Sequence, residues 1–320
     1  MNPPPEESAR PDAMIELREL TRRFGELTAV DRLSFAVGRG ELFGLVGPDG
    51  AGKTTTLRML AGVLRPTSGD ALLAGTSVAR EPERVKHAIA YMSQRFGLYT
   101  DLTVRENLDF YADLYRVPRR ERAERLARLY EFSNLRPFED RLAGQLSGGM
   151  KQKLGLSCAL VHEPEILLLD EPTFGVDPIS RRELWLIVHE MVGRGVTAIV
   201  STAYMDEAER FDRLALLHRG RVLALDRPEA LQGTLSGTLF EVRADDPRRA
   251  RELALALPEV ARATLFGDRV HLILATGGVQ QVAAALRAAG LGGVEARPLA
   301  PSLEDVFIQR IAEAEREEAA

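Results

Sequence analysis

The residues from Gly47 to Thr54 have the types and the spacing of a loop that binds phosphate. The segment reads Gly-Pro-Asp-Gly-Ala-Gly-Lys-Thr, which satisfies the pattern G-x-x-x-x-G-K-[ST] at every fixed position. An apolar strand is predicted directly before it, and a helix from Lys53 to Leu64 directly after it. Glycines let backbone N–H groups converge on phosphate oxygens, and the helix N-terminus adds partial positive charge. The segment therefore predicts a site for the phosphates of a nucleotide.

Individual side chains of this loop have expected roles. Lys53 would bridge the terminal phosphates, and Thr54 would supply a hydroxyl group to Mg²⁺. Asp49 can accept hydrogen bonds from its own turn, and its charge would lie near the phosphates without preventing binding. The residues expected to bind the nucleotide here are Gly47, Pro48, Asp49, Gly50, Ala51, Gly52, Lys53, Thr54 and Thr55.

Two carboxylates follow a second predicted strand. The apolar segment from Ile166 to Leu169 has the pattern of a buried strand and ends at Asp170 and Glu171. Asp170 can hold Mg²⁺, and Glu171 can orient or deprotonate a water molecule. Taken alone, the segment also fits a strand followed by two solvated acids. Together with the glycine-rich loop it favours hydrolysis of a nucleoside triphosphate.

The segment from Leu146 to Gln152 reads Leu-Ser-Gly-Gly-Met-Lys-Gln and resembles the signature motif of ABC transporter ATP-binding proteins. Ser147, Gly148 and Gly149 stand at the start of a predicted helix, and such a start suits the γ-phosphate of ATP. The segment precedes the acidic strand by the interval typical of the family. The resemblance implies ATP and Mg²⁺ as cofactors. It also implies that these three residues contact ATP bound to a second ATP-binding domain.

Further positions match the family in chain order. The resemblance implies that Phe24 stacks on adenine, that Gln94 is the glutamine of the Q-loop, and that Gly175 to Asp177 crosses the dimer interface. Phe24 could equally be a core aromatic residue and Gln94 a surface amide, although their order favours the functional roles. The expected catalytic residues are Glu171, Lys53 and Gln94, and the expected metal ligands are Thr54, Gln94 and Asp170.

The sequence departs from the family at one catalytic position. After the predicted strand from Val196 to Val200 the family places Ser-Thr-His, whereas this chain has Ser-Thr-Ala, with Ala203 in place of the histidine. That histidine is expected to contact the γ-phosphate and to help position Glu171, so its loss should slow hydrolysis more than binding. We therefore expect an impaired site on this chain and a signature that completes the site of a different ATPase subunit. The histidines expected in packing or surface positions are His87, His162, His189, His218 and His271.

The order of the predicted elements indicates two domains in 320 residues. Alternating strands and helices over 14–232 predict an α/β fold with a mostly parallel sheet, and the resemblance implies a P-loop NTPase domain of the ABC type. A helical subdomain is expected at about 95–150, opening with a capping box at Thr103. The order strand-helix-hairpin-helix-strand over 233–320 predicts a small α+β, ferredoxin-like accessory or regulatory domain with a charged terminal helix. Residues 1–13 are expected to be a disordered leader.

Two local predictions are more specific. Residues 14–46 are predicted to form short strands that lead into the glycine-rich loop. Asp177 and Pro178 have the residue types of a helix N-cap and of the first position of a helix.

Composition limits the partners and the compartment. The chain has 45% hydrophobic and 28% charged residues and a net charge of −5, with no basic patch, so we expect no nucleic acid partner. The single cysteine, Cys158, suits a reducing compartment and is expected to be buried. Apolar runs are strand-sized, well short of the roughly 20 residues that a membrane helix requires. Any link to a membrane is therefore expected to run through a partner.

A narrower resemblance points to export. Pro301 to Ile308 resembles the ending of ATPases of ABC-2 type exporters, and Lys151 to Leu156 and Val176 to Leu184 resemble the N-terminal ATPase half of YbhF-like multidrug exporters. Those exporters carry two ATPase domains, whereas this chain has one. The resemblance implies a cytoplasmic protein on the inner face of the membrane, attached to an ABC-2 type permease through Gln94 to Thr103 and the helical subdomain. A soluble non-transport ABC ATPase and a regulatory subunit with little hydrolysis are the alternatives.

Overall fold

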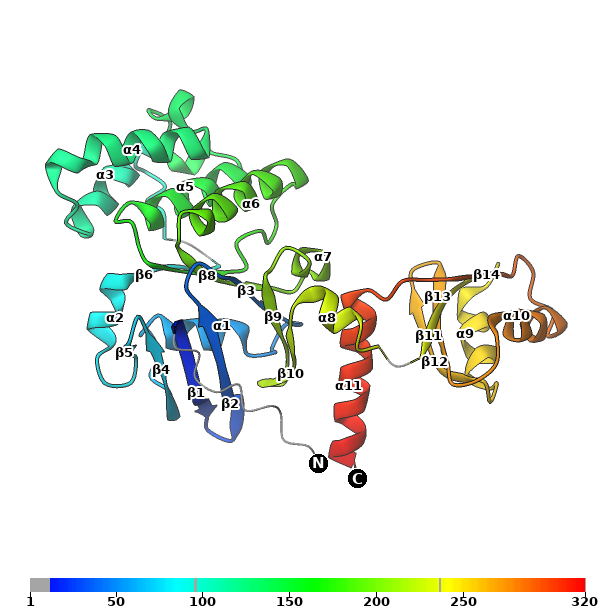
Figure 1. Cartoon of the computed structure of the whole chain (residues 1–320). Coiled ribbons are helices and arrows are strands. Elements are labelled where there is room, and N and C mark those ends of the chain that lie inside the picture. Colours follow the sequence, from blue (N-terminus) through cyan, green and yellow to red (C-terminus); the bar gives the residue numbers. More distant parts are fainter. Residues whose placement is uncertain (1–11, 95–96, 236, 320) are drawn as a thin grey trace. The chain divides into compact units, whose positions relative to one another are not determined.

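The computed structural model describes residues 12–94, 97–235 and 237–319. The chain forms two compact units, Met1–Pro228 and Glu229–Ala320 (Figure 1). The division falls slightly before the domain boundary expected between 232 and 233. All but the last two residues of the expected leader at 1–13 lie outside the described residues, and Ala13 already begins the first strand.

The first unit is built on a six-stranded sheet with the order β10-β9-β3-β8-β7-β6. All neighbours run parallel except β10, which is antiparallel to β9. The three central strands β3, β8 and β7 are buried along their whole length, as expected for parallel strands covered on both faces. The prediction of an α/β fold with a mostly parallel sheet is confirmed. The strands are β3 (Leu42–Val46), β6 (Ile89–Met92), β7 (Ile166–Asp170), β8 (Thr197–Thr202), β9 (Arg213–His218) and β10 (Arg221–Asp226).

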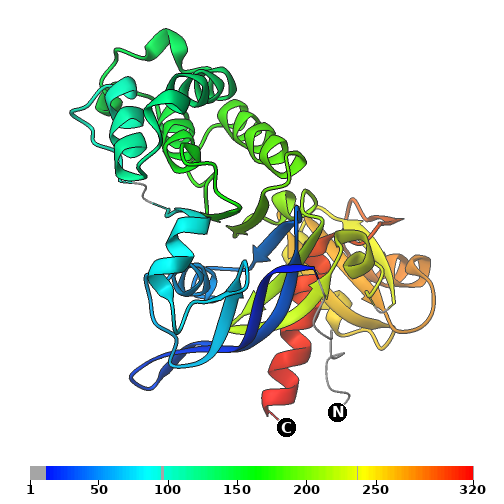
Figure 2. The same ribbon diagram turned by 60° about the vertical axis from the view of Figure 1, so that its left-hand side comes forward.

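A second, antiparallel sheet of four strands in the order β2-β1-β4-β5 shares a hydrophobic core with the first. The prediction of short strands over 14–46 is wrong for its first two strands, because β1 and β2 each extend over 12 residues and pair as a hairpin. Register shifts along this pair let long strands bend without losing their pairing. Figure 2 shows the hairpin in blue. The strands are β1 (Ala13–Phe24), β2 (Leu27–Gly38), β4 (Ser68–Leu73) and β5 (Thr76–Ser77).

Helix α1 (Lys53–Leu60) follows the glycine-rich loop and contributes buried Leu57 and Met59 to the shared core. The prediction that this helix reaches Leu64 is wrong. The helix ends at Leu60 because Gly62 adopts a left-handed backbone conformation with φ of 65°, which is a common helix ending. Two further short helices border the sheets, α2 (Pro82–Ala88) and α7 (Met205–Ala208).

A group of helices stands at one side of the first unit, in green in Figure 1. The capping box predicted at Thr103 is confirmed, since its side chain accepts from Glu106 N and the Glu106 carboxylate accepts from Thr103 N. The N-cap predicted at Asp177 is also confirmed. Cys158 is buried as expected, and burial raises the pKa of its thiol. The helices are α3 (Val104–Leu114), α4 (Arg119–Ser133), η1 (Arg136–Phe138), η2 (Ala143–Gln145), α5 (Gly148–Leu160) and α6 (Pro178–Gly193).

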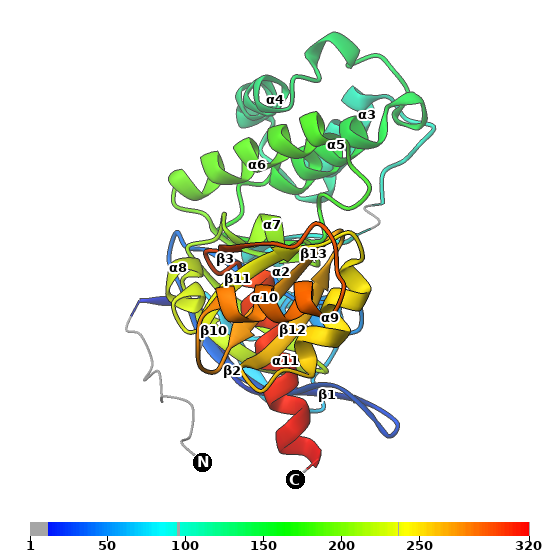
Figure 3. The same ribbon diagram turned by 90° about the vertical axis from the view of Figure 1, so that its right-hand side faces the viewer.

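The second unit begins within α8 (Pro228–Gln232) and contains an antiparallel sheet in the order β12-β13-β11-β14. β11 and β12 are parallel to each other with β13 between them, which is the split βαβ arrangement expected of a ferredoxin-like domain. α9 and α10 cover one face of this sheet, and their buried residues form its core together with buried residues of the strands (Figure 3). The elements are β11 (Thr238–Arg243), α9 (Pro247–Leu255), β12 (Val260–Phe266), β13 (Arg269–Leu274), α10 (Val279–Ala288), β14 (Glu295–Pro298) and α11 (Leu303–Ala319).

Over residues 12–94, 97–235 and 237–319, no helix combines the length and the apolar character that a membrane-spanning segment requires.

Candidate nucleotide site

The glycine-rich loop connects the carboxyl end of β3 to the first residue of α1. A side chain at Gly47 would collide with the carbonyl oxygen of Leu217, and a Cβ at Gly52 would lie 2.6 Å from the carbonyl oxygen of Ala29. Gly50 and Gly52 have φ values of 78° and 102°, which side-chain-bearing residues rarely adopt. The loop can therefore adopt this path only with glycine at these positions.

Lys53 is the buried cation of the loop, with 4% of its side chain exposed. Its Nζ donates to the carbonyl oxygens of Gly47 at 2.8 Å and Pro48 at 3.1 Å. The same ammonium group lies 3.1 Å from Oε1 of Glu171. A buried charge is tolerated only when it is paired and hydrogen-bonded. The lysine is thus held at the centre of the loop by one carboxylate and two carbonyl groups.

Asp170 is the last residue of β7, lies beside Thr54 of the glycine-rich loop and is 1% exposed. Its Oδ1 accepts hydrogen bonds from Thr54 Oγ1 at 3.0 Å and from Ser201 Oγ at 2.8 Å. The hydroxyl group of Tyr91 lies 3.5 Å from Oδ2. Burial and the charge of Asp170 raise the pKa of Tyr91 to about 12, so the tyrosine stays protonated and can donate to the carboxylate. The hydroxyl of Thr54 and the carboxylate of Asp170 are therefore adjacent oxygen donors.

Glu171 turns away from the strand by adopting a φ of 49°, an uncommon conformation for a residue other than glycine. Its backbone N–H is held by the carbonyl oxygen of Ser201 at 3.2 Å and the hydroxyl oxygen of Ser201 at 3.0 Å. The turn places the carboxylate between Lys53 and the side-chain amide of Gln94, whose Nε2 donates to Oε2 at 3.1 Å. Strained backbone of this kind is typical of functional sites.

The structure brings five of the predicted residues into one cluster at the carboxyl ends of β3 and β7. They are Lys53, Thr54, Gln94, Asp170 and Glu171. Tyr91 and Ser201 belong to the cluster but were missed by sequence reasoning. Ser201 pairs in register with Asp170 across the parallel strands β7 and β8, so the ends of adjacent strands were the available signal.

The signature residues lie elsewhere, at the start of α5. Ser147 is the N-cap of this helix and accepts from the backbone N–H of Met150 at 3.3 Å. A side chain at Gly149 would collide with the Ser180 hydroxyl group at the start of α6, whereas the space around Gly148 is open. The signature turn is therefore seated on α6, with an exposed helix N-terminus suited to an anion.

Phe24 lies in neither group of residues. It ends β1 in the antiparallel sheet, is 46% exposed, and has the guanidinium group of Arg22 4.5 Å above its ring. The exposure argues against the alternative role as a core aromatic residue. Stacking on adenine stays a prediction for this position.

Ala203 follows the last residue of β8 and is exposed. Histidines with described side-chain contacts include His189, whose ring centroid lies 6.0 Å from that of Trp185. His162 stacks on Tyr115 at 3.9 Å, and the imidazole of His271 lies 2.7 Å from the carboxylate of Asp305. None of these contacts involves Ala203.

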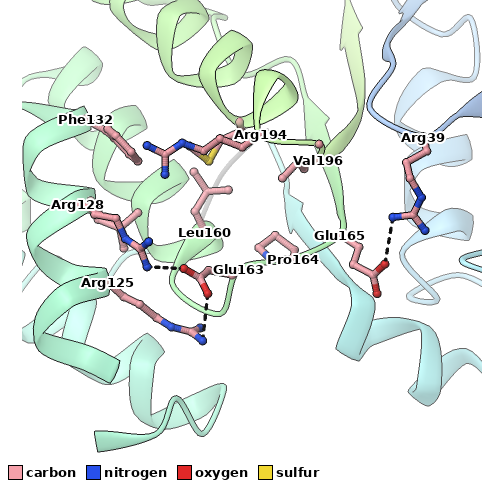
Figure 4. A pocket seen from close by; sticks show the side chains of 13 residues that line it. Arg39, Arg125, Arg128, Phe132, Leu160, Glu163, Pro164, Glu165, Arg194 and Val196 are labelled. Atoms are coloured by element: carbon pink, nitrogen blue, oxygen red, sulfur yellow. Dashed lines mark hydrogen bonds and ion pairs between the residues drawn. The ribbon is translucent and has the colours of Figure 1, made fainter. Parts of the chain in front are cut away.

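A cavity of about 390 Å³ lies at the opposite edge of the parallel sheet, where β7 and β8 begin (Figure 4). Its guanidinium groups are engaged in ion pairs. The Glu163 carboxylate lies 3.1 Å from Arg125 and 2.6 Å from Arg128, and Arg39 faces Glu165 at 3.7 Å. The pairs of Glu163 join α4 to the loop before β7, whereas the Arg39–Glu165 pair joins the turn after β2 to the same loop.

Known proteins resemble this chain in both sequence and structure. The family model for ABC transporters matches residues 30–174, which include the glycine-rich loop, the signature and both acids. The probable multidrug ABC transporter ATP-binding protein YbhF of Escherichia coli (strain K12) is 46% identical over 301 residues, covering 93% of this chain and 52% of that protein. The Nod factor export ATP-binding protein I of Rhizobium sp. (strain N33) is 37% identical over 297 residues, covering 92% of this chain and 96% of that protein. The chain belongs to the ABC transporter ATP-binding family.

A solved member of the ABC family has the same architecture. A dimeric ATP-binding cassette in a post-hydrolysis state, bound to ADP and Pi, superposes with a TM-score of 0.61 at 25% identity, covering 67% of this chain and 98% of that one. By contrast, the chain spans about half the length of YbhF, 52% of that protein.

The residues of this ABC site fit MgATP. A glycine-rich loop leading into a helix suits phosphate groups, and the buried Lys53 adds the positive charge that they require. Adjacent hydroxyl and carboxylate oxygens on Thr54 and Asp170 match the oxygen ligands that Mg²⁺ prefers.

Proposed function

We propose that this chain is the ATP-binding and ATP-hydrolysing subunit of an ABC-2 type export complex, in which ATP-driven dimerisation powers a separate membrane permease. The observation that carries the proposal is the cluster of Lys53, Glu171 and Gln94 beside the Thr54–Asp170 pair. This cluster joins a phosphate-binding loop to a carboxylate able to orient water. The export role rests on the names of the relatives, a multidrug ATP-binding protein and a Nod factor export ATP-binding protein.

Binding of ATP would rearrange the cluster around Lys53. Phosphate oxygens entering the loop compete with Glu171 for the Lys53 ammonium group, which now lies 3.1 Å from that carboxylate. When Lys53 turns to the β- and γ-phosphates, Glu171 is released to accept a hydrogen bond from the attacking water. Nucleotide entry would thus activate the base by removing its ion-pair partner.

Thr54 and Asp170 would hold Mg²⁺, with Gln94 reaching the same region from its hydrogen bond to Glu171. The bound ion supplies positive charge that offsets the charge of the phosphates. Ser201 and Tyr91 orient the Asp170 carboxylate by donating to it. Phe24 would stack on adenine from the β1–β2 hairpin.

Hydrolysis adds water to the γ-phosphate and releases ADP and inorganic phosphate. Glu171 orients and deprotonates that water, while the position normally held by histidine is Ala203, which has no group for the γ-phosphate. We therefore assign slow turnover to this chain's own site. Its signature, Ser147 to Gly149, would complete the site of a second ATP-binding domain, in a homodimer or on a different ATPase subunit.

The permease would dock on the helical group beside Gln94. Four aromatic rings form a continuous series there, from Tyr99 through Phe110 and Tyr111 to Tyr115, with neighbouring ring centroids 4.6 to 6.4 Å apart. Tyr99 is 44% exposed, and an exposed aromatic cluster is typical of a protein interface. Through this contact the chain would lie in the cytoplasm on the inner face of the membrane.

The second unit is proposed to be an accessory domain for regulation or dimer contact. Deletion of residues 233–320 should then change dimer formation or turnover at constant ATP affinity. Unchanged assembly and unchanged turnover in the truncated chain would rule this role out.

The decisive test is steady-state ATP hydrolysis by the purified chain, with Glu171→Gln as the control. We expect ATP binding with little turnover. Turnover that disappears in Glu171→Gln would show a competent homodimer and contradict the impaired site. ATP binding without turnover would leave two roles for the chain. It could work with a second ATPase subunit, or it could be a regulatory subunit with little hydrolysis, a role that Ala203 favours. If the chain co-purifies in detergent with a membrane permease, and hydrolysis is restored in that complex, the role beside a second ATPase subunit would be supported.

A further inference from the structure

A buried carboxylate, Glu207, lies four residues after Ala203 in α7 and is 1% exposed. Its Oε2 accepts from Thr202 Oγ1 at 2.7 Å, and its Oε1 accepts from the indole Nε1 of Trp185 at 3.2 Å. Removing a carboxylate from water is costly unless donors face both oxygens. Here each oxygen has its own donor, and the two donors come from different elements, β8 and α6. Glu207 therefore fixes the end of β8 relative to α6.

Through Thr202, Glu207 is linked to the phosphate-binding loop. Thr202 Oγ1, which donates to Glu207, also accepts from the backbone N–H of Tyr204 at 3.0 Å. The carbonyl oxygen of Thr202 accepts from the backbone N–H of Gly47 at 3.2 Å. Glu207 thus holds the backbone on both sides of Ala203 and, through one residue, the first residue of the phosphate-binding loop.

Through Trp185 and helix α6, Glu207 is linked to the signature turn. Trp185 lies in α6, and Arg181 of the same helix places its Nε 3.8 Å from Glu207 Oε1. Ser180, one residue earlier, is the contact that excludes a side chain at Gly149. Trp185 and Ser180 lie in the same helix, so a displacement of α6 at Trp185 would also move Ser180 and the signature turn that it contacts.

We propose that Glu207 is a positioning residue that couples ATP binding at this chain's own loop to its own signature turn, through Thr202 on one side and Trp185 on the other. The inference rests on the proposed function, because it needs ATP in the loop. Its consequence is that a site with Ala203 still reports its occupancy to the signature that serves the second domain. The chain would sense ATP even where it hydrolyses ATP slowly.

Trp185 is the single tryptophan of the chain, so its fluorescence reports on this contact directly. We would titrate the full chain with MgATP and record tryptophan emission, with ATP affinity measured separately by calorimetry. The test variant is Thr202→Val, which removes the hydroxyl group but keeps the shape, and the matched control is Thr202→Ser, which keeps the hydroxyl group. We expect an emission change in the wild type and in Thr202→Ser. In Thr202→Val we expect no change in tryptophan emission on addition of MgATP, while ATP affinity changes by no more than about threefold.

The possible results test the Glu207 coupling separately from the proposed function. A full emission change in Thr202→Val, or none in a wild type that binds ATP, would overturn the coupling and leave the proposed function intact. Absence of ATP binding by calorimetry would overturn both. If Thr202→Val does not fold, hydrogen exchange on the wild type decides. ATP must alter exchange both at the start of α5 and in the first turns of α6, and unchanged exchange at either place would refute the coupling.

Discussion

The phosphate-binding loop and the signature turn are both glycine turns at the start of a helix, but their surroundings differ. The first is enclosed by backbone carbonyl groups of Leu217 and Ala29 and lies against the buried Lys53–Glu171 pair. The second rests on the side chain of Ser180 and leaves its helix N-terminus exposed. In the proposed function the loop binds ATP, whereas Ala203 stands at the end of β8 where the family resemblance implies a histidine. On this proposal, ATP binding, ATP hydrolysis and completion of a second site depend on different groups of residues, so mutations should affect them separately.

Removal of the buried lysine should have the largest effect. Lys53→Ala leaves Glu171 without its cation and removes the charge that attracts the phosphates. Loss of two charge-assisted hydrogen bonds to the β- and γ-phosphates, at about 2 kcal/mol each, corresponds to roughly 1,000-fold weaker ATP binding. Calorimetric titration measures this, with Lys86→Ala as the control, because Lys86 pairs with Glu83 on the surface. Equal ATP affinity in Lys53→Ala and the wild type would mean that the loop does not bind the nucleotide.

Restoration of the histidine comes next. Ala203→His should raise turnover by about 100-fold with little change in ATP affinity, because one donor to the γ-phosphate acts mainly in the transition state. Ala203 is exposed, and the backbone on either side of it is held by hydrogen bonds of Thr202, so a larger side chain at this position should not disturb the core. Steady-state kinetics of both proteins give the comparison. No gain in turnover would show that another difference limits hydrolysis.

The signature turn can be probed with two neighbouring glycines. Gly149→Ala places a methyl group against Ser180 and should lower the stability of the first unit by about 2 kcal/mol. Gly148→Ala adds the same group to open space and should leave stability nearly unchanged. Chemical denaturation measures both. Equal destabilisation by the two changes would contradict the seating of this turn on α6.

Acid titration should give the smallest effect. Hydrogen bonds from the backbone of Ser180 lower the pKa of Asp177, the N-cap of α6, below its usual 3.8. A carboxyl group whose folded pKa is lowered stabilises the fold above its ordinary pKa, and this stability is lost as pH falls through the folded pKa. Asp177→Asn still caps the helix but cannot titrate.

The difference in melting temperature between wild type and Asp177→Asn should therefore change only below about pH 4. Asp101→Asn, at an exposed carboxyl group elsewhere in the first unit, is the control. A difference that stays constant from neutral pH to pH 3 would show that the charge of Asp177 contributes nothing to the cap.

The sequence was sufficient for the parts of the site that are contiguous in the chain. The glycine-rich loop, the acids after β7 and the N-caps Thr103 and Asp177 are local patterns, and the structure contains each of them. Ser201 and Tyr91 were not predictable in the same way, because their contact with Asp170 depends on the order of strands across the sheet. The separate antiparallel sheet was missed for the same reason, since strand pairing joins segments that are distant in sequence.

The edge strand β14 of the second unit limits the addition of strands from other molecules. It is only four residues long and ends in Pro298, which has no backbone N–H to offer a further strand. Long, flat edges recruit strands from other molecules, and short edges with proline resist this. Concentrated samples of the chain should therefore not form fibrils by strand addition at this edge.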